Sequence, residues 1–475
     1  MAILVYDPGI AITLFKMIKR VNGVAQRYAG LRRQIDLTPL LGEGGAVRTT
    51  KSIQGQPAGA FSISFPDQPD TITGDTLYAL IEPMDMIEIR MARSPGQYAS
   101  SKLPLVMRGF ISTVTRSEAM GTDGTPQRFV IVSGQDMAKL WLINAVFWPA
   151  LAITDPELIA IWAIGASIGM APALYTASSF VQGMVGVLNK RVADLAALAQ
   201  QTVLPFTCIA SVPEGYIVPA QESQITAGSY WDIMTSFADQ PWNEIFVRDA
   251  EAGPQVIYRP VPFKDINGKF IMPGAADPGS FKVDISDVIS MDVSRSDERI
   301  ANIFWTDPTN YVPGSAGGVT AAAVANGSEL DFQHQNNLPT LFGRKILNAS
   351  SNLQSGTLNA LASAPADQGQ ANGGLVAWWQ NRNNELKLLN RDNSVFEDGS
   401  ATMKGSELLV PGQYMKLTRG ALTSTSYVVQ VDHNFMPFQG WTSMVQFIRG
   451  DGFLVRDKYA GNPFWAEGRQ GPYAS

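Results

Sequence analysis

Alternation of apolar and polar residues is the feature that most limits what this chain can fold into. Residues 61–65 and 84–90 alternate strictly, which is typical of strands with one buried face. Residues 106–114, with a bulge expected at Gly109, and residues 128–133 have the composition of further strands. Because turn-forming residues separate these short segments, they favour a barrel or sandwich over alternating strands and helices.

The rest of the chain mixes helices with strands. Residues 229–238 predict a helix capped by Ser229, and residues 242–249 and 255–260 predict a hairpin after it. We therefore expect a mainly β fold with α insertions, of the α+β class. Three further strands near the C-terminus predict a meander at residues 412–417, 426–433 and 441–448.

One long segment carries no charge. Between Glu157 and Lys190 the chain has no charged residue, and Pro149, Pro156 and Pro172 divide the wider region 136–205 into short helical pieces. A helix that is apolar on every face is buried in protein or in a membrane. The run before Pro172, roughly 17 residues long, is at the lower limit for crossing a bilayer. Burial in protein is therefore favoured, and membrane contact stays open.

Charge and residue counts exclude several classes of function. Only 16% of the residues are charged, against roughly 25% in an average soluble protein, which suits a surface covered by neighbouring proteins. The net charge is −6 without a basic stripe, so specific nucleic-acid binding is not expected. One cysteine, Cys208, and two histidines, His334 and His433, leave no basis for a disulfide framework or an ordinary zinc site. We expect no cofactor and no metal.

Residues 165–169 match the G-x-S-x-G pattern of a hydrolase nucleophile. That pattern needs a strand before the serine and a helix after it, whereas an apolar helical run surrounds Ser167. We expect His334 to be exposed and His433 to be hydrogen-bonded at a turn, so neither is favoured as a catalytic base. The same five residues match G-x-x-x-G, which is typical of closely packed helices. We therefore expect no catalytic residue.

Three segments together resemble the central hub proteins of bacteriophage tail baseplates, including the late control proteins of temperate phages. In residues 130–140 a strand ends in a Gly-x-Asp turn and a helix follows. Residues 237–260 are similar to the helix-then-hairpin unit of such hubs. Residues 408–449 resemble their last barrel, in which Pro-Gly-Gln at 411–413 opens a strand. The uncharged segment at 140–190 departs from the family pattern.

The resemblance implies a homotrimeric structural protein without catalytic activity. Each subunit would supply two related tube-like β-barrels, so that six barrels match the hexameric tail tube while the opposite face meets the trimeric central spike. It implies a place in the virion, in the tail baseplate, where the genome passes through the lumen. Because no signal peptide is evident, assembly is expected in the host cytoplasm. The partners would be the tail tube protein, the spike protein, the tape-measure protein and the surrounding baseplate proteins.

This reading divides the chain into four domains: a first tube-like barrel at 1–135, an apolar helical insert at 136–205, a mixed α+β domain with the helix and hairpin at 206–300, and a second tube-like barrel at 301–475 that contains a loop-rich insertion at 310–400 and a C-terminal tail.

Seven apolar side chains are the candidate interface residues, since such side chains in segments of low charge often anchor a partner. Two other functions stay open. A tail-associated peptidoglycan hydrolase would need two carboxylates facing each other in a cleft. A membrane-contacting or pore-forming tail protein would act through residues 140–190. The seven candidates are Trp162, Ile164, Met170, Trp378, Trp379, Phe464 and Trp465.

Overall fold

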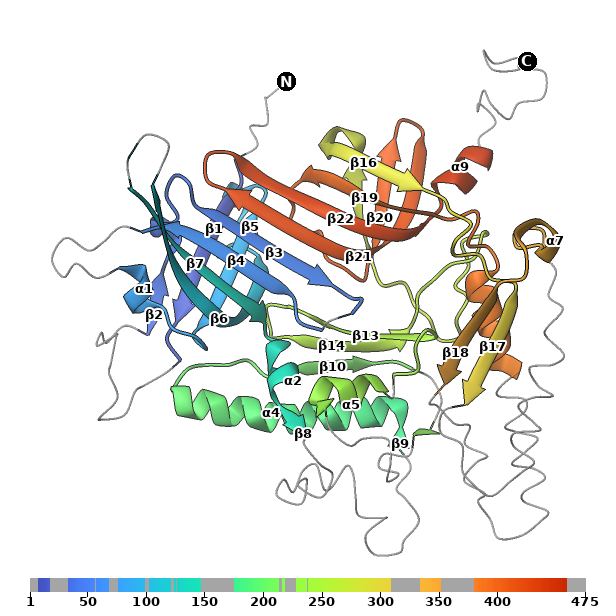
Figure 1. The fold of residues 1–475 in the computed structure, drawn as a ribbon, viewed down its shortest axis with the longest axis horizontal. Coiled ribbons are helices and arrows are strands. Elements are labelled where there is room, and N and C mark those ends of the chain that lie inside the picture. The colour runs from blue at the N-terminus through green and yellow to red at the C-terminus, as the bar shows by residue number, and fades with distance from the viewer. Residues whose placement is uncertain are drawn as a thin grey trace, which may run out of the picture.

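The fold is mainly β, as the alternation predicts, and one large sheet of thirteen strands dominates it (Figure 1). Most neighbouring strands in this sheet are antiparallel, and the sheet has two halves, each with its own apolar core. The computed structural model describes residues 7–17, 33–55, 57–67, 76–98, 102–120, 124, 126–146, 175–212, 216–217, 228–236, 238–308, 334–351 and 380–458.

The first half, here called the N-terminal sheet, has the strand order β3-β4-β7-β6-β5-β1-β2. Because alternate residues of a strand point to the same face, Val47, Ile63 and Val132 stand opposite one another on neighbouring strands and are fully buried. The short helices η1 (Thr38–Leu40), α1 (Leu77–Leu80) and η2 (Pro95–Gln97) connect its strands. The strands are β1 (Gly9–Phe15), β2 (Gln34–Asp36), β3 (Ala46–Ser52), β4 (Ala60–Pro66), β5 (Met86–Ala92), β6 (Leu105–Met120) and β7 (Pro126–Asp136).

The second half, here called the C-terminal sheet, has the order β16-β19-β22-β21-β20-β15, in which only the β15–β20 pair is parallel among the described residues. Its core contains Met403, Leu417 and Val445. Helix α9 (Gly452–Lys458) follows the last strand, and η4 (Ile285–Asp287) joins the first two. The strands are β15 (Ser280–Asp284), β16 (Val288–Ser294), β19 (Glu397–Lys404), β20 (Tyr414–Arg419), β21 (Leu422–Met436) and β22 (Gly440–Gly450).

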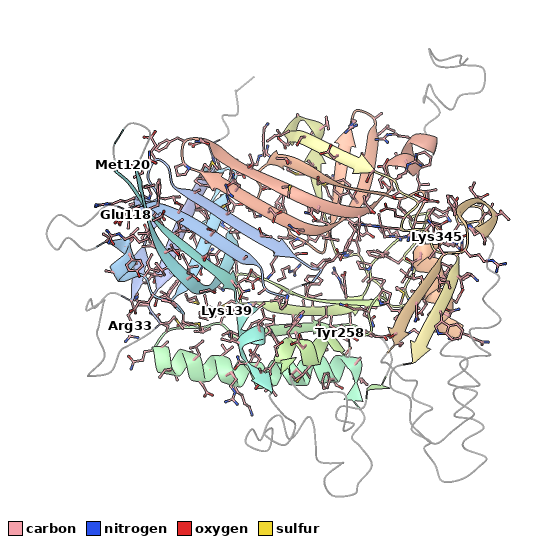
Figure 2. All side chains as sticks on the ribbon, in the orientation of Figure 1. Arg33, Glu118, Met120, Lys139, Tyr258 and Lys345 are labelled. Carbon is pink, nitrogen blue, oxygen red and sulfur yellow. The ribbon has the colours of Figure 1, made fainter. Side chains whose placement is uncertain are left out.

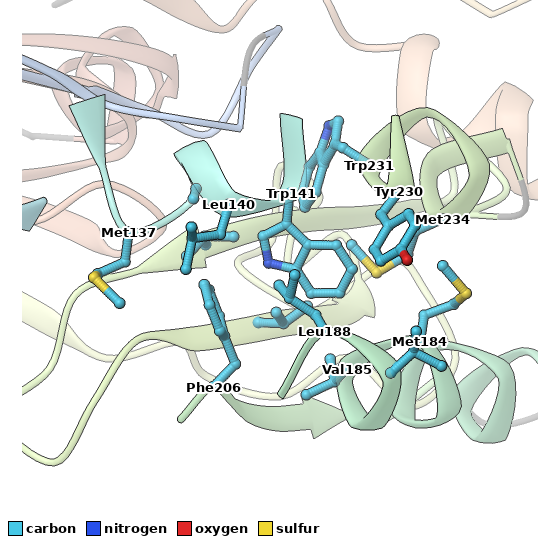
Figure 3. Close-up of a cluster of buried hydrophobic side chains, with 14 of the residues drawn as sticks. Met137, Leu140, Trp141, Met184, Val185, Leu188, Phe206, Tyr230, Trp231 and Met234 are labelled. Carbon is cyan, nitrogen blue, oxygen red and sulfur yellow. The ribbon is translucent and has the colours of Figure 1, made fainter. Parts of the chain in front are cut away.

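A smaller sheet with helices, here called the middle layer, lies beneath the large sheet in the view of Figure 1. Its strands are ordered β10-β14-β13, with β10 parallel to β14. Trp141 is fully buried in the core beneath them and makes edge-to-face contacts with Phe206 and Trp231, at ring-centroid distances of 5.7 and 6.2 Å (Figure 3). The elements are α2 (Lys139–Ile143), α4 (Ala177–Ala199), β10 (Thr207–Ala210), α5 (Tyr230–Ser236), β13 (Asn243–Arg248) and β14 (Gln255–Pro260), with two-residue strands β8 (Ala145–Val146), β9 (Tyr175–Thr176), β11 (Tyr216–Ile217) and β12 (Gly228–Ser229).

A side module packs against one end of the middle layer. It combines the parallel strands β17 (Ile303–Pro308) and β18 (Ile346–Ser351) with the helix α7 (Pro339–Phe342) and a helix at residues 380–390. Leu386 of that helix is fully buried beside Phe304 in the same core. Apart from β17, these elements lie within the insertion at 310–400 that was expected to be rich in loops.

Several local predictions are confirmed, and others differ from the structure. The α5 cap is confirmed, since the Ser229 hydroxyl accepts a hydrogen bond from the Asp232 amide at 3.1 Å. The register of β6 shifts at Val106 against β5 and at Ser112 against β7, instead of at Gly109, whose missing side chain allows close approach to the Gln135 carbonyl. The strands β15 and β16 contribute to the C-terminal core, although they precede residue 301.

Candidate functional site

The seven interface candidates from the sequence all lie outside the described residues, as do residues 165–169 with the G-x-S-x-G match. The residues are Trp162, Ile164, Met170, Trp378, Trp379, Phe464 and Trp465. The candidate site consists of residues from other parts of the chain.

His433 is hydrogen-bonded, as expected, but it lies within strand β21 and not at a turn. Its Nδ1 is 2.7 Å from the hydroxyl of Ser443 on the neighbouring strand, and its ring stands 5.3 Å from that of Trp441. Burial lowers the pKa of His433 to about 4. The imidazole is thus a buried structural group. His334, expected to be exposed, is half-buried 3.7 Å from Asp392.

Two long hairpins repeat the same construction in the two halves of the large sheet. In β6–β7 the register shifts between Ile111 and Thr113, and in β21–β22 it shifts between Val428 and Gln430. Outward from each hairpin the next strands correspond as well: β4 and β3 follow β7, whereas β19 and β16 follow β22. Aligning the two bulges makes Thr113 equivalent to Gln430. The chain therefore contains a structural repeat, which the sequence analysis did not detect.

The two halves are joined by one pair of strands. The first part of β21 pairs with β20, whereas its second part leaves that strand and pairs antiparallel with β3, from Gln430 opposite Ser52 to Phe435 opposite Val47. At the end of this hairpin, Phe435 and Trp441 enter the core of the N-terminal sheet, where Trp441 is fully buried. The end of one hairpin thus completes the core of the neighbouring half.

The strand parts equivalent to this junction are open. One edge of β6 pairs with β5, but this pairing ends at Phe110. Beyond it, residues 113–120 have no partner strand on this edge among the described residues, and most of them are exposed. On the other half, β16 ends the sheet and pairs only with β19 within the described chain. Its Ile289 is 62% exposed and its Val293 39% exposed. We define these two surfaces, β6 residues 113–120 and strand β16, as the open edges.

Buried charges hold the middle layer to the N-terminal sheet. Lys51 of β3 forms an ion pair with Asp136 and lies 3.9 Å from Asp249, which follows β13. Burial lowers the pKa of Lys51 and raises that of Asp249. Nearby, Arg90 of β5 makes a two-pronged contact with Glu251 at 2.7 and 2.8 Å. Groups of opposite charge therefore fix the orientation of β13–β14 against this half.

A second polar cluster holds the middle layer to the C-terminal sheet. The carboxylate of Glu244 on β13 accepts hydrogen bonds from Arg259 at 2.6 Å and from the hydroxyl of Tyr427 on β21 at 2.7 Å. Arg259 also donates to the Gly412 carbonyl at 2.6 Å. Burial raises the pKa of Glu244. One hairpin therefore contacts both halves of the large sheet, and it fixes them in a single relative orientation.

The described residues contain no cluster of three or more His, Cys, Asp or Glu side chains that could hold a metal ion. Within the same residues, no helix combines the length and the apolar character needed to cross a membrane.

No protein-family model and no curated protein matches the sequence. Solved structures similar to this chain include a 43 kDa tail protein of prophage MuSo2 from Shewanella oneidensis, which is 11% identical with a TM-score of 0.47 over 93% of this chain and 98% of the other. A tail protein from Neisseria meningitidis is 9% identical with a TM-score of 0.46 over 94% of this chain and 98% of the other. Prophage tail protein gp18 from Listeria monocytogenes is 7% identical with a TM-score of 0.44 over 92% of this chain and 94% of the other.

These neighbours belong to the class that the sequence resembles, phage tail proteins, and their names describe structural components and no enzyme. The features of this chain that bear on its role are its open edges and its structural repeat.

Proposed function

We propose that this chain is the structural hub of a phage tail baseplate, a homotrimer that joins the hexameric tail tube to the trimeric central spike and forms part of the DNA conduit. Each copy contains two sheets of the same construction, so three copies supply six equivalent units. Six units can match a sixfold tube on one face while the threefold arrangement of subunits matches a trimer on the other. In this proposal the two sheets are the tube-like barrels expected from the sequence.

One observation carries the proposal: the junction made by β21 and β3 inside the chain has an unpaired equivalent at the open edges. If β6 of one copy pairs with β16 of the next, as β21 pairs with β3, the contact is head-to-tail and can close into a ring. Ring closure would also remove exposed strand edges, which otherwise promote aggregation. The exposed apolar side chains of β16 support its burial in an assembly.

The equivalence also predicts the register between copies. Within the chain, Asn434 of β21 stands opposite Arg48 of β3. Counting from the aligned bulges makes Ser117 of β6 equivalent to Asn434 of β21. Following the strand pairs outward, from β7 through β4 to β3 in one half and from β22 through β19 to β16 in the other, makes Asp292 of β16 equivalent to Arg48 of β3. We therefore expect Ser117 of one copy to lie opposite Asp292 of the next.

Partners and further contacts follow the same proposal. The tail tube protein, the central spike protein, the tape-measure protein and the surrounding baseplate proteins would cover the remaining faces of the ring. The seven apolar candidates named from the sequence are proposed contacts to these partners. The low fraction of charged residues, 16%, supports extensive coverage of the surface.

The first test is the mass of the purified chain in solution, measured by size-exclusion chromatography with light scattering and without detergent. A mass of about three times the 51.4 kDa of the chain is expected. A soluble monomer at every concentration tested would overturn the proposed trimer, and clearing of a cell-wall suspension by that monomer would favour the hydrolase. Aggregation that only detergent relieves would favour the membrane-contacting alternative.

The second test examines the register. Ser117→Cys and Asp292→Cys are combined in a Cys208→Ser background, so that only the introduced thiols can pair. Residues directly opposite each other in a strand pair have Cβ atoms roughly 4.5–5.5 Å apart, which mild oxidation can link. We expect a covalent trimer on a non-reducing gel. The matched control combines Ser117→Cys with Ser290→Cys, two residues along the same strand, and equal linkage in both pairs would contradict the predicted register.

A further inference from the structure

A cavity of about 360 Å³ opens at the edge of the C-terminal sheet, between β16, the turn joining β20 to β21, and α9. Three arginines and one carboxylate line it: Arg295, Arg419, Arg456 and Glu397. Arg456 pairs with Glu397 at 3.1 Å, and Arg295 stacks 3.7 Å above the Phe453 ring. The cavity therefore carries a surplus of positive charge.

In the N-terminal half, the junction residues stand in an apolar setting. Phe435 of β21 lies opposite Val47 of β3, and both belong to the N-terminal core. Trp441, the partner of Phe435 across the hairpin, is packed so closely that it would overlap any side chain at Gly405. The end of the β21–β22 hairpin thus acts as an apolar plug for the first half.

Charged residues take several, but not all, of the equivalent positions in the other junction. Val47 corresponds to Met291, which lines the arginine-rich cavity. On the inserting side, Phe435 corresponds to Glu118 of β6, counted from the aligned bulges. By the same count Trp441 corresponds to Arg128, so an oppositely charged pair replaces the two aromatic residues of the plug. Glu118 is the acidic member of that pair, and the receiving surface is basic.

The surface that receives the hairpin end also has a charged residue where the N-terminal half has an apolar one. β5 pairs with β6, and β20 pairs with the equivalent strand β21. Met86 and Tyr414 stand opposite equivalent residues of these strands, so counting onward along β5 and β20 makes Met91 equivalent to Arg419. Met91 is fully buried in the N-terminal core, whereas Arg419 is exposed and its guanidinium lies 3.9 Å from the Met291 sulfur. Each side of the contact therefore has a charged residue at a position that is apolar in the other junction, and Glu118 and Arg419 carry opposite charges.

Glu118 is placed to reach another molecule. It lies near the end of the β6–β7 hairpin beside Met120, far from β16 of the same copy (Figure 2). Its side chain is 46% exposed and pairs with Arg116 and, at 3.7 Å, with Arg128 of its own hairpin. Met120 is 75% exposed, which is unusual for a large apolar side chain. A surface outside this copy is therefore the natural contact for this hairpin end.

We propose that the end of the β6–β7 hairpin of one copy inserts into the arginine-lined cavity of the next copy, with Glu118 facing Arg419. The inference rests on the proposed trimer and adds the chemistry of its contact. It gives the two kinds of junction in the ring different character: one is apolar and lies within each chain, and the other is charged and lies between chains. Because salt screens exposed charges, the contact between chains is the salt-sensitive one.

The test reverses the two charges separately and together. Glu118→Arg and Arg419→Glu should each raise the dissociation constant of the trimer at least tenfold, measured by sedimentation at low salt. The double variant restores opposite charges and should return the constant to within about threefold of the original chain. Added salt should weaken the original trimer and leave the single variants less affected.

Matched controls separate this inference from the proposed function. Asp194→Arg reverses a charge that is 77% exposed on α4 and should leave the constant unchanged. Circular dichroism of each variant monitors folding, and both single variants alter exposed side chains. If Ser117 and Asp292 still link while Glu118→Arg leaves the constant unchanged, the charged contact is wrong and the strand pairing stands. If the original chain forms no trimer and the cysteines introduced at positions 117 and 292 do not link, the proposed function itself fails.

Discussion

The hydroxyl of Tyr427 lies 2.7 Å from a carboxylate oxygen of Glu244, and this contact ties the C-terminal sheet to the middle layer. Both groups are buried, and Arg259 completes the cluster from the strand beside Glu244. A buried carboxylate is stable only when its hydrogen bonds are made, so the cluster connects the packing of three strands.

Replacing Tyr427 by Phe should destabilise the fold by about 1–3 kcal/mol, because it removes a donor from a buried carboxylate. The free energy of unfolding is measured by urea denaturation at a fixed protein concentration. Tyr98→Phe is the matched control, since the Tyr98 hydroxyl also donates to a carboxylate, that of Glu407 at 2.5 Å, in a much more open position. Equal losses in the two variants would contradict the importance of burial at Tyr427.

Replacing Lys51 by Met should cost about 3–5 kcal/mol, because Asp136 and Asp249 would keep their buried position without their cation. Lys102→Met removes a lysine that is 71% exposed and lies 3.9 Å from the carboxylate of Glu251, a weak surface contact. This variant should change stability by less than about 1 kcal/mol. The comparison uses urea midpoints of both variants. A Lys51→Met variant as stable as the original would show that the carboxylates become protonated without cost.

Replacing Gly405 by Ala should destabilise the fold by about 1–3 kcal/mol, because the added methyl would meet the ring of Trp441 at 2.2 Å. That ring fills the N-terminal core, so the damage would appear in the half of the molecule that does not contain Gly405. Gly186→Ala in α4 is the control, since nothing lies within 4 Å of its added methyl. Thermal unfolding should show a lower midpoint for the first variant and an equal or higher one for the second.

His433 should make stability depend on pH in the acid range. Its pKa is lowered by burial from 6.5 to about 4, so between these values the unfolded chain takes up a proton that the folded chain does not. The contribution of His433 to the free energy of unfolding is fully present above pH 6.5 and is lost as the pH falls toward 4, by roughly 3 kcal/mol in total.

The variant His433→Gln isolates that effect, since Gln retains a hydrogen-bonding group opposite Ser443 and has no charge to gain. The difference in unfolding free energy between original and variant should shrink as the pH falls from 6.5 to 4. A constant difference over this interval would mean that the imidazole is protonated in the folded chain too. Trp441 and the Leu409 backbone also face this ring and do not titrate here.

Local patterns predicted many strands but not their grouping. The alternation at residues 61–65 predicts β4, and the Ser229 cap predicts α5, because both depend on neighbouring residues. The interaction of β21 with two different partner strands depends on residues nearly four hundred positions apart, which no local pattern contains. The bulges at Ser112 and Val429 were missed for the same reason, since neither sits at a glycine.

The open edges illustrate another limit of sequence. Apolar and polar residues alternate only weakly in the exposed part of β6, which includes Thr115. A strand edge that faces solvent and one that pairs with another molecule therefore have the same composition. The signal that could have found this site is the internal repeat itself. It is carried by pairing and bulge position, whereas Thr113 and Gln430, or Glu118 and Phe435, share no side-chain chemistry.

The plug formed by Phe435 and Trp441 also has a consequence for biosynthesis. The ribosome completes β1 to β7 long before it reaches these two residues, so the emerging N-terminal half leaves the exit tunnel with a gap in its core and an unpaired edge on β3. Such a nascent chain would depend on chaperones or on rapid completion of translation to escape aggregation. Fragments that end before residue 435 are therefore poor candidates for expression, and the order of synthesis delays final folding until nearly the whole chain has been made.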